Sequence, residues 1–147
     1  MKILKRGLTN IEICNHLKYE KTFLGCFPSN KTPTILKYPC SIILNTEKSG
    51  ESGEHWIGLY LEKDHSFYFD SFGLPILEDD IFNFLQKKYK KVIYNKHCIQ
   101  DISSVSCGLY CISFVKHVNS EKSFKKFLKH FSINDLKQND MKVLNLI

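Results

Sequence analysis

The sequence predicts a single α+β domain over residues 1–147, in which a small antiparallel or mixed sheet is flanked by helices. Three observations support this prediction. The chain has the length of one domain and contains no internal repeat or long linker that would divide it. Strand patterns rich in aromatic residues and isoleucine fall between residues 40 and 94. Helical patterns precede and follow these strands.

The first third of the chain predicts a helix and then a loop. Residues 9–18 begin with a threonine suited to helix capping, and their apolar spacing places Ile11, Cys14 and Leu17 on the inner side. Residues 23–33 contain one glycine and two prolines, which interrupt regular structure. We therefore expect this second segment to be a loop.

The middle of the chain predicts the sheet. Residues 40–45, CSIILN, form a short apolar run typical of a buried strand. Residues 48–54 are a polar turn that contains glycines. The aromatic segments 55–62 and 66–73 flank a turn at residues 63–65, which predicts an antiparallel hairpin.

Helices dominate the remaining sequence, with one further strand at residues 91–94, KVIY. Residues 77–89 have acids in their first turn and lysines in their last, which complements the helix dipole. Their apolar stripe consists of Leu77, Ile81, Phe84 and Leu85. Three more helices are expected after residue 106, over residues 107–118, 121–131 and 133–146.

The amino-acid composition limits the classes of protein to which this chain can belong. The hydrophobic fraction of 43% and charged fraction of 24% are those of an ordinary soluble globular protein. No apolar run approaches the ~20 residues of a membrane span, and the N-terminal residues are too polar for a signal peptide. We expect a protein of the nucleus, the cytoplasm or a virion, neither secreted nor membrane-bound. The six cysteines include no CxxC pair, so we expect neither a disulfide framework nor a metal site.

Positive charge gathers near the C-terminus, although the net charge of the whole chain is only +6. In residues 121–131, four lysines recur at helical spacing: Lys122, Lys125, Lys126 and Lys129. The opposite side of this expected helix is apolar and contains Phe124, Phe127, Leu128 and Phe131. Two interpretations stay open, a solvated surface and a stripe that binds the phosphates of DNA.

Two cysteines four residues apart raise the question of a nucleophile. A thiol needs activation, which a helix N-terminus, a nearby imidazole and oxyanion donors can supply. Cys107 stands where the polar loop 100–106 gives way to an apolar helix, and Gly108 after it lets the backbone approach a substrate. Cys111 lies one turn further inside the helix, so we expect it to be a core residue.

Three further residues complete a catalytic set around Cys107. His55 opens the first strand of the hairpin, directly before the only tryptophan, Trp56. A histidine in such a place is usually structural, but the hairpin brings Asp70 to the same sheet edge, where it would orient the imidazole. Aspartate is depleted in strands, which favours the paired interpretation. Gln100, in the loop before the helix, offers a side-chain amide to an oxyanion.

These residues, in the order His-Trp, Asp, Gln and Cys-Gly, resemble the cysteine peptidase clan that contains adenain, the adenoviral maturation protease, and the SUMO-specific proteases. The likeness to the adenain family is the closer of the two and covers most of the chain. The segments that carry it are FLGCF (23–27), CSIILNT (40–46), GEHW (53–56), FDSFG (69–73) and QDISSVSCGLYC (100–111). Asp70 departs from the adenoviral glutamate and agrees with the SUMO proteases. The chain is also shorter than adenain, mainly between Gly73 and Gln100.

The resemblance implies an adenain-like, papain-type fold and a set of roles. His55 would be the general base, Asp70 its orienting residue, Cys107 the nucleophile and Gln100 an oxyanion donor, with Trp56 packed beside the site. The implied function is a viral or virus-like-element endopeptidase that cleaves capsid or core precursors at Gly-X or Gly-Gly sites.

Other expectations accompany this function. We expect a monomer whose substrates are viral precursor polypeptides. No cofactor is implied, although the resemblance suggests activation by DNA or by a viral peptide. A deubiquitinase or SUMO-type isopeptidase would need the same catalytic residues. A non-enzymatic DNA-binding packaging protein is a further alternative.

Overall fold

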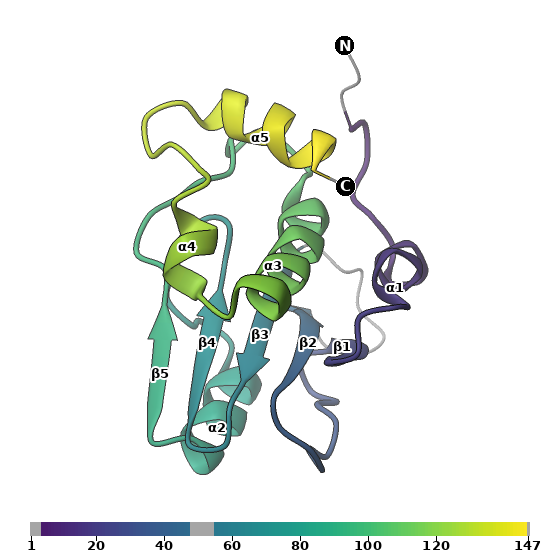
Figure 1. Ribbon diagram of the computed structural model, residues 1–147, viewed down its shortest axis with the longest axis vertical. Helices are drawn as coiled ribbons and strands as arrows, with labels where there is room; N and C mark the ends of the chain where they lie inside the picture. Colours follow the sequence, from purple (N-terminus) through teal and green to yellow (C-terminus); the bar gives the residue numbers. More distant parts are fainter. Residues whose placement is uncertain (1–3, 48–54, 147) are drawn as a thin grey trace.

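The computed structural model describes residues 4–47 and 55–146 of the chain. A mixed five-stranded sheet with helices on its two faces forms the fold, as the sequence predicts (Figure 1). The elements in chain order are α1 (Asn10–Leu17), β1 (Phe23–Pro28), β2 (Cys40–Asn45), β3 (Trp56–Leu61), β4 (His65–Phe69), α2 (Asp79–Lys88), β5 (Lys91–Tyr94), α3 (Cys107–Glu121), α4 (Phe124–Leu128) and α5 (Leu136–Asn145). The turn expected at residues 48–54 lies outside the described residues.

The strands follow one another across the sheet in sequence order, β1-β2-β3-β4-β5. Strand β3 is antiparallel to both β2 and β4. At the two edges, β1 pairs with β2 in parallel and β5 pairs with β4 in parallel. In the β3–β4 hairpin Gly58 pairs with Phe69, which brings the start of β3 and the end of β4 to one edge of the sheet. This is the hairpin that the sequence predicts.

Alternating side chains give the sheet two apolar faces. On one face Leu59 and Leu61 pack with Ile81 and Leu85 of α2. On the other face Tyr60 and Phe69 pack with α3, which is apolar on nearly every side and runs through the main core. Helices α1, α4 and α5 contact α3 in turn, so α3 is the central helix of the molecule (Figure 1).

Close packing of α3 on β3 depends on Gly58. A Cβ at this position would lie 2.7 Å from Cδ2 of Phe114 in α3, closer than real side chains approach. Because glycine has no Cβ, the helix can rest directly on the strand. The position of the α3 N-terminus relative to the hairpin therefore depends on this contact.

The segment 23–33, expected to be a loop, instead begins with an edge strand. Phe23–Pro28 pairs with β2 in parallel, with a register shift between Phe23 and Cys26. Gly25 lies in this irregular stretch with φ +139°, and Pro28 is the last residue of the strand. An edge strand tolerates both residues, because a bulge accommodates the glycine and proline, which lacks an N–H, is accepted in edge strands.

The predicted helices differ from the observed ones mainly at their ends and inner faces. In α1 the buried residues are Ile13 and Leu17, whereas Ile11 is 68% exposed, so the expected inner side was wrong by part of a turn. Leu77 precedes α2 and is exposed. The apolar stripe of α2 is otherwise as predicted.

The helix expected over residues 121–131 is divided. Helix α3 continues to Glu121 and ends at Lys122, which adopts the left-handed conformation with φ +56°. Ser123 then caps α4, a short helix, through a hydrogen bond from the Lys126 N–H. A lysine in the left-handed conformation is uncommon and gives no sequence signal of a helix end, since the usual marker is glycine. The aromatic residues of this segment are buried, as predicted.

Candidate active site

Cys107 is the first residue of α3 and is 6% exposed. The preceding residue, Ser106, makes no side-chain capping hydrogen bond to the helix. The backbone N–H groups of the first turn of a helix have no acceptor within the helix itself. The sulfur therefore lies beside donors and at the positive end of the helix dipole, where a negative charge is stabilised.

His55 directly precedes β3, and Asp70 directly follows β4. The hairpin register brings them together, with His55 Nε2 2.7 Å from Asp70 Oδ1. The side chains are 15% and 5% exposed, respectively. Cys107 lies near enough to the imidazole to raise its pKa. Because Nε2 is engaged by Asp70, Nδ1 is the ring nitrogen available to the thiol.

The environment of His55 favours the charged imidazolium. Burial by itself lowers the pKa of this ring, but hydrogen bonds and charge interactions with Asp70 and Cys107 outweigh it and raise the pKa to about 9. His55 is therefore protonated at neutral pH. An imidazolium beside a cysteine is the arrangement that stabilises a thiolate nucleophile.

Hydrogen bonds from Phe72 and Asn95 hold Asp70 in place. Its Oδ1 accepts a hydrogen bond from the Phe72 N–H at 2.8 Å. Asn95, which follows β5 and is buried, accepts from the Asp70 N–H through Oδ1 and donates from Nδ2 to the Asp70 carbonyl. Sequence reasoning missed Asn95 as a support of the site. Its signal was an asparagine directly after a strand, a position that turns also favour.

Phe72 is a second residue that the sequence analysis did not single out. Its ring stacks on the His55 imidazole, with centroids 4.9 Å apart and planes 21° from parallel. Together with the Asp70 hydrogen bond, this contact fixes the plane of the imidazole. Trp56, which was predicted to pack beside the site, donates from Nε1 to the Leu8 carbonyl and so anchors the N-terminal segment next to the start of β3.

Gln100 is fully buried and connects its own loop with the loop after β4. Its Oε1 accepts a hydrogen bond from the Ser71 hydroxyl, next to Asp70. Its Nε2 donates to the carbonyl and the hydroxyl of Ser104, both at 3.1 Å. The amide thus lies in the loop before Cys107, as predicted, but its N–H groups point to Ser104. Serving an oxyanion would require them to exchange that partner.

Gly108 is also positioned differently from the expectation. A Cβ at this position would lie 3.2 Å from the Leu8 Cβ and 3.4 Å from Ile13 Cδ1. The missing side chain therefore makes room for α1 and the segment before it. Its expected role in close approach to a substrate stays a prediction.

Cys111, in contrast with Cys107, is fully buried in the main core. Burial raises the pKa of its thiol well above the ordinary value, with smaller contributions from Cys107 and Asp70. A thiol that resists ionisation is a poor nucleophile. Of this pair, the structure brings Cys107 and not Cys111 to the His55–Asp70 pair.

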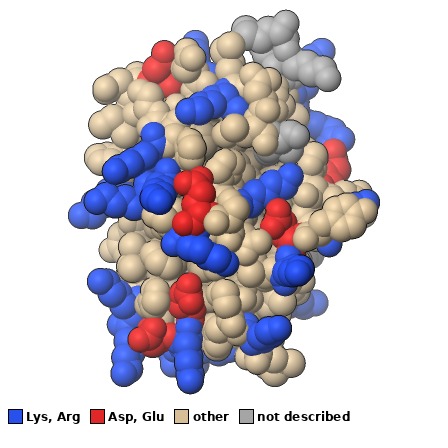
Figure 2. Space-filling view, in the orientation of Figure 1, with Lys and Arg blue, Asp and Glu red and all other residues tan. Residues whose placement is uncertain are grey.

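The four lysines of the expected DNA-binding stripe are exposed but do not share one helix. Lys125 and Lys126 lie in α4, Lys129 is its C-terminal cap, and Lys122 is the cap of α3. Figure 2 shows lysine side chains gathered over α4, with acidic side chains beside them. The surface is basic, although the helical stripe is interrupted.

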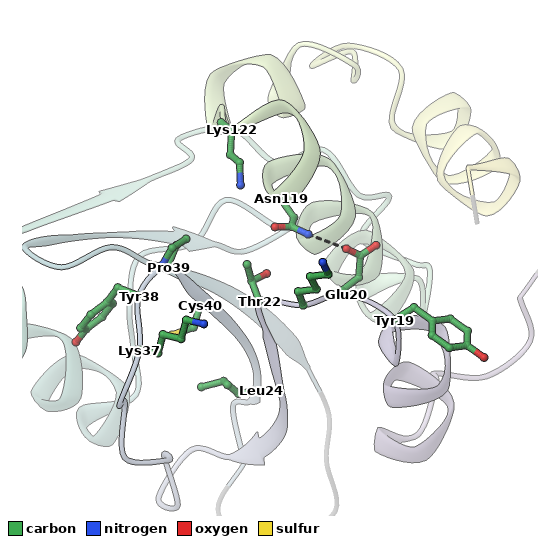
Figure 3. Close-up of a pocket in the computed structure, with 11 residues that line it drawn as sticks. Tyr19, Glu20, Thr22, Leu24, Lys37, Tyr38, Pro39, Cys40, Asn119 and Lys122 are labelled. Carbon is green, nitrogen blue, oxygen red and sulfur yellow. Dashed lines mark hydrogen bonds between the residues drawn. The ribbon is translucent and has the colours of Figure 1, made fainter.

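The close-up in Figure 3 shows an open groove elsewhere on the molecule. Its walls come from the α1–β1 connection, the segment before β2 and the C-terminal end of α3, and they include Lys37, Tyr38 and Lys122. A hydrogen bond from Asn119 Nδ2 to Glu20 crosses its edge at 2.8 Å. Asn119 follows Cys107 by 12 residues on α3, about 18 Å along the helix, so the groove is separate from the candidate active site.

Comparisons with known proteins bear on the fold. The crystal structure of the ASFV pS273R protease superposes with a TM-score of 0.62 at 15% identity, covering 94% of this chain and 67% of that one. The central domain of the uncharacterized Lpg1148 protein from Legionella pneumophila gives a TM-score of 0.51 at 11% identity, covering 96% of this chain and 99% of that one. No protein-family model matches the sequence, and no curated protein does. At these identities the likeness shows a shared α+β fold.

Proposed function

We propose that the protein is a cysteine endopeptidase of viral or virus-like-element type, which cleaves capsid or core precursor proteins at Gly-X or Gly-Gly sites. One observation carries the proposal: His55 bonds Asp70 through Nε2 and has its pKa raised by Cys107, which is the first residue of a buried helix. The fold shared with a viral protease supports it.

The proposed reaction has two halves. The Cys107 thiolate attacks the carbonyl carbon of the scissile peptide bond, and the oxygen that becomes negative is held by the free N–H groups at the start of α3. The His55 imidazolium then gives its proton to the leaving amine, and the C–N bond breaks to leave a thioester. In the second half His55 takes a proton from water and the hydroxide attacks the thioester carbonyl; the C–S bond then breaks, the new carboxylic acid leaves, and the Cys107 thiolate and His55 imidazolium are restored.

Asp70 acts through His55 in this scheme. Its carboxylate stabilises the imidazolium and fixes the ring with Nδ1 toward the sulfur. Gln100 would add a donor to the oxyanion only after its Nε2 leaves Ser104. The loop between Gln100 and Cys107 therefore has to adjust when substrate binds, and we propose that this adjustment accompanies catalysis.

No helix in the described part of the chain is long and apolar enough to cross a bilayer. The proposed substrates are polypeptides that reach Cys107, and the basic surface over α4 is proposed to hold the enzyme on packaged DNA near them.

Cleavage assays with two substrate classes test the proposal. Fluorogenic peptides that end in Gly-Gly and contain Gly-X bonds should be hydrolysed by the unmodified chain and not by Cys107→Ala. Conjugates of ubiquitin and SUMO form the second class. Hydrolysis of these conjugates without hydrolysis of free peptides would replace the endopeptidase with an isopeptidase. Absence of Cys107-dependent cleavage of both classes, with and without DNA, would contradict the enzymatic function.

A further inference from the structure

Three metal-ligating side chains converge at the C-terminal end of α3, far from the catalytic residues. His117 and Glu121 are four residues apart on α3 and so share one face of the helix. His130 follows α4 and reaches the same place. One ligand atom from each of the three side chains lies within 4.8 Å of the other two. His117 follows Cys107 by ten residues, about 15 Å along the helix.

From this cluster we propose a binding site for a divalent transition-metal ion, zinc in the first place, held by His117, Glu121 and His130. Two imidazoles and one carboxylate are a ligand set that zinc uses in proteins, with a water molecule in the fourth tetrahedral position. Hard cations such as calcium and magnesium prefer sets made of oxygen atoms.

The hydrogen bonding of His117 prepares it as a ligand. Its Nδ1 lies 2.8 Å from the Ser113 carbonyl oxygen, which can only accept, so Nδ1 carries the proton. Nε2 therefore keeps a lone pair for a metal. A ligating histidine that donates its other N–H to a backbone carbonyl is the usual arrangement at metal sites, because it fixes both tautomer and ring plane.

Packing adds to this preparation. The centroid of the His117 ring lies 5.9 Å from that of Phe127, which is fully buried, and 5.2 Å from that of His130. The two imidazoles are thus already neighbours before any ion binds. Helix α4 holds Phe127 and leads directly into His130, so the same core contact positions two of the three ligands.

The spacing of the other pair fits a tetrahedral ion. His130 Nε2 lies 3.2 Å from Glu121 Oε1. Zinc bonds of 2.0–2.1 Å at tetrahedral angles place neighbouring ligand atoms about 3.4 Å apart. The metal would replace the proton that now joins these two atoms, and His117, with a ligand atom within 4.8 Å of both, would move closer when the ion binds. The side chains of His130 and Glu121 are 38% and 29% exposed, so an ion can enter from solvent.

The bound ion would tie the end of α3 to the segment after α4. These two parts of the chain are separated by the left-handed Lys122 and by a helix of one to two turns. An ion that binds the folded state and not the unfolded chain raises stability in proportion to the logarithm of its concentration. We therefore assign this site a structural role in the C-terminal half.

Titration of the metal-free chain with Zn²⁺, and with Co²⁺ as a spectroscopic probe, tests the site. The experiment uses the Cys107→Ala background, which removes the catalytic thiol as a competing ligand. We expect one ion per chain, visible absorption of four-coordinate Co²⁺ and a melting temperature that rises with Zn²⁺. His130→Ala and Glu121→Gln should each weaken binding by more than the roughly 10–100-fold that loss of an outer-shell partner costs.

His65→Ala is the matched control. His65 is also a partly exposed histidine paired with a carboxylate, Asp64, at 2.8 Å, but it is not part of the three-residue cluster. This variant should bind as the parent does. His130→Gln, which keeps the size and polarity of the side chain, replaces His130→Ala if far-UV circular dichroism shows that the alanine variant is unfolded. Absence of stoichiometric binding in the parent, or equal binding by the His130 variant, would overturn the proposal.

Discussion

His55 Nε2 and Asp70 Oδ1 lie 2.7 Å apart, although 15 residues separate them in the chain. The β3–β4 hairpin accounts for their meeting, because one residue stands just before the first strand and the other just after the second. Cys107 then reaches the same imidazole from the start of α3. The hairpin and the helix, fixed on each other through Gly58, thus build the site that the proposed function needs.

Asp70→Asn should reduce peptide cleavage strongly but leave weak activity. An asparagine cannot stabilise the imidazolium by charge, while Phe72 still stacks on the ring and keeps part of its orientation. The pKa of His55 should fall in this variant, because Asp70 is the main cause that raises it. Chemical shifts of the His55 ring measured against pH by NMR check this. An unchanged His55 titration would contradict the pairing.

The same pairing predicts how stability depends on pH. The pKa of His55 is about 9 in the folded chain against 6.5 for the ordinary group, so the folded state binds the proton more tightly. The resulting stabilisation is fully present below pH ~6.5 and is lost as pH rises through about 9. Urea unfolding across this window should show a steeper loss for the unmodified chain than for Asp70→Asn. Parallel curves would count against the assignment.

His55→Ala should abolish cleavage, since it removes the imidazole that interacts with Cys107. The matched control is His65→Ala, which removes a histidine that is likewise bonded to an aspartate but lies in the exposed β3–β4 turn. Initial rates on a Gly-Gly peptide should stay near those of the unmodified chain in this control. If His65→Ala, or His97→Ala, were as damaging as His55→Ala, the hairpin argument would be wrong.

Replacing Lys122, Lys125, Lys126 and Lys129 with glutamine should weaken binding to duplex DNA and flatten its salt dependence. Each phosphate contact contributes a log–log slope of about −0.9, so the lost contacts can be counted. Cleavage of a short peptide in the absence of DNA should not change. The control replaces four other lysines, Lys87, Lys88, Lys90 and Lys91. Equal effects of both sets, or no salt-sensitive binding at low ionic strength, would return these lysines to a solvated surface.

Gly58→Ala should destabilise the fold by about 1–3 kcal/mol, the usual cost of overpacking. The added Cβ would meet the Phe114 ring at 2.7 Å and push α3 away from β3. Gly7→Ala is the control, because nothing lies within 4 Å of a Cβ there. The free energy of unfolding in urea measures both. Equal stability of the two variants would show that α3 does not rest on β3 as described.

Strong local patterns allowed most of the fold to be predicted. The apolar run at residues 40–45 and the hairpin led to the sheet and to the His55–Asp70 pair. What the sequence alone did not reveal depends on tertiary context. The edge strand β1 contains Gly25 and Pro28, which indicate a loop unless a neighbouring strand accommodates them. Lys122 ends α3 in a conformation that its residue type rarely adopts.

The same limit applies to the supports of the candidate site. Asn95 bonds Asp70 from a loop 25 residues further along the chain, and Phe72 stacks on His55 from the irregular segment after β4. No spacing rule connects these pairs in the sequence. The convergence of His117, Glu121 and His130 likewise depends on where α4 folds back on α3. Loop geometry also sets the hydrogen-bond partners of Gln100. The sequence position indicated an oxyanion donor, whereas in the folded loop the amide donates to Ser104.

The central claim is that Cys107, and not its neighbour Cys111, is the nucleophile. A peptide vinyl sulfone ending in Gly-Gly, followed by mass-spectrometric mapping of the adduct, tests this claim most directly. We expect rapid, stoichiometric labelling of Cys107 that is lost in His55→Ala, and labelling unchanged within a few-fold in Cys111→Ala, whose cost is ~1 kcal/mol of packing. Preferential labelling of Cys111, or labelling of Cys107 that does not depend on His55, would contradict the account.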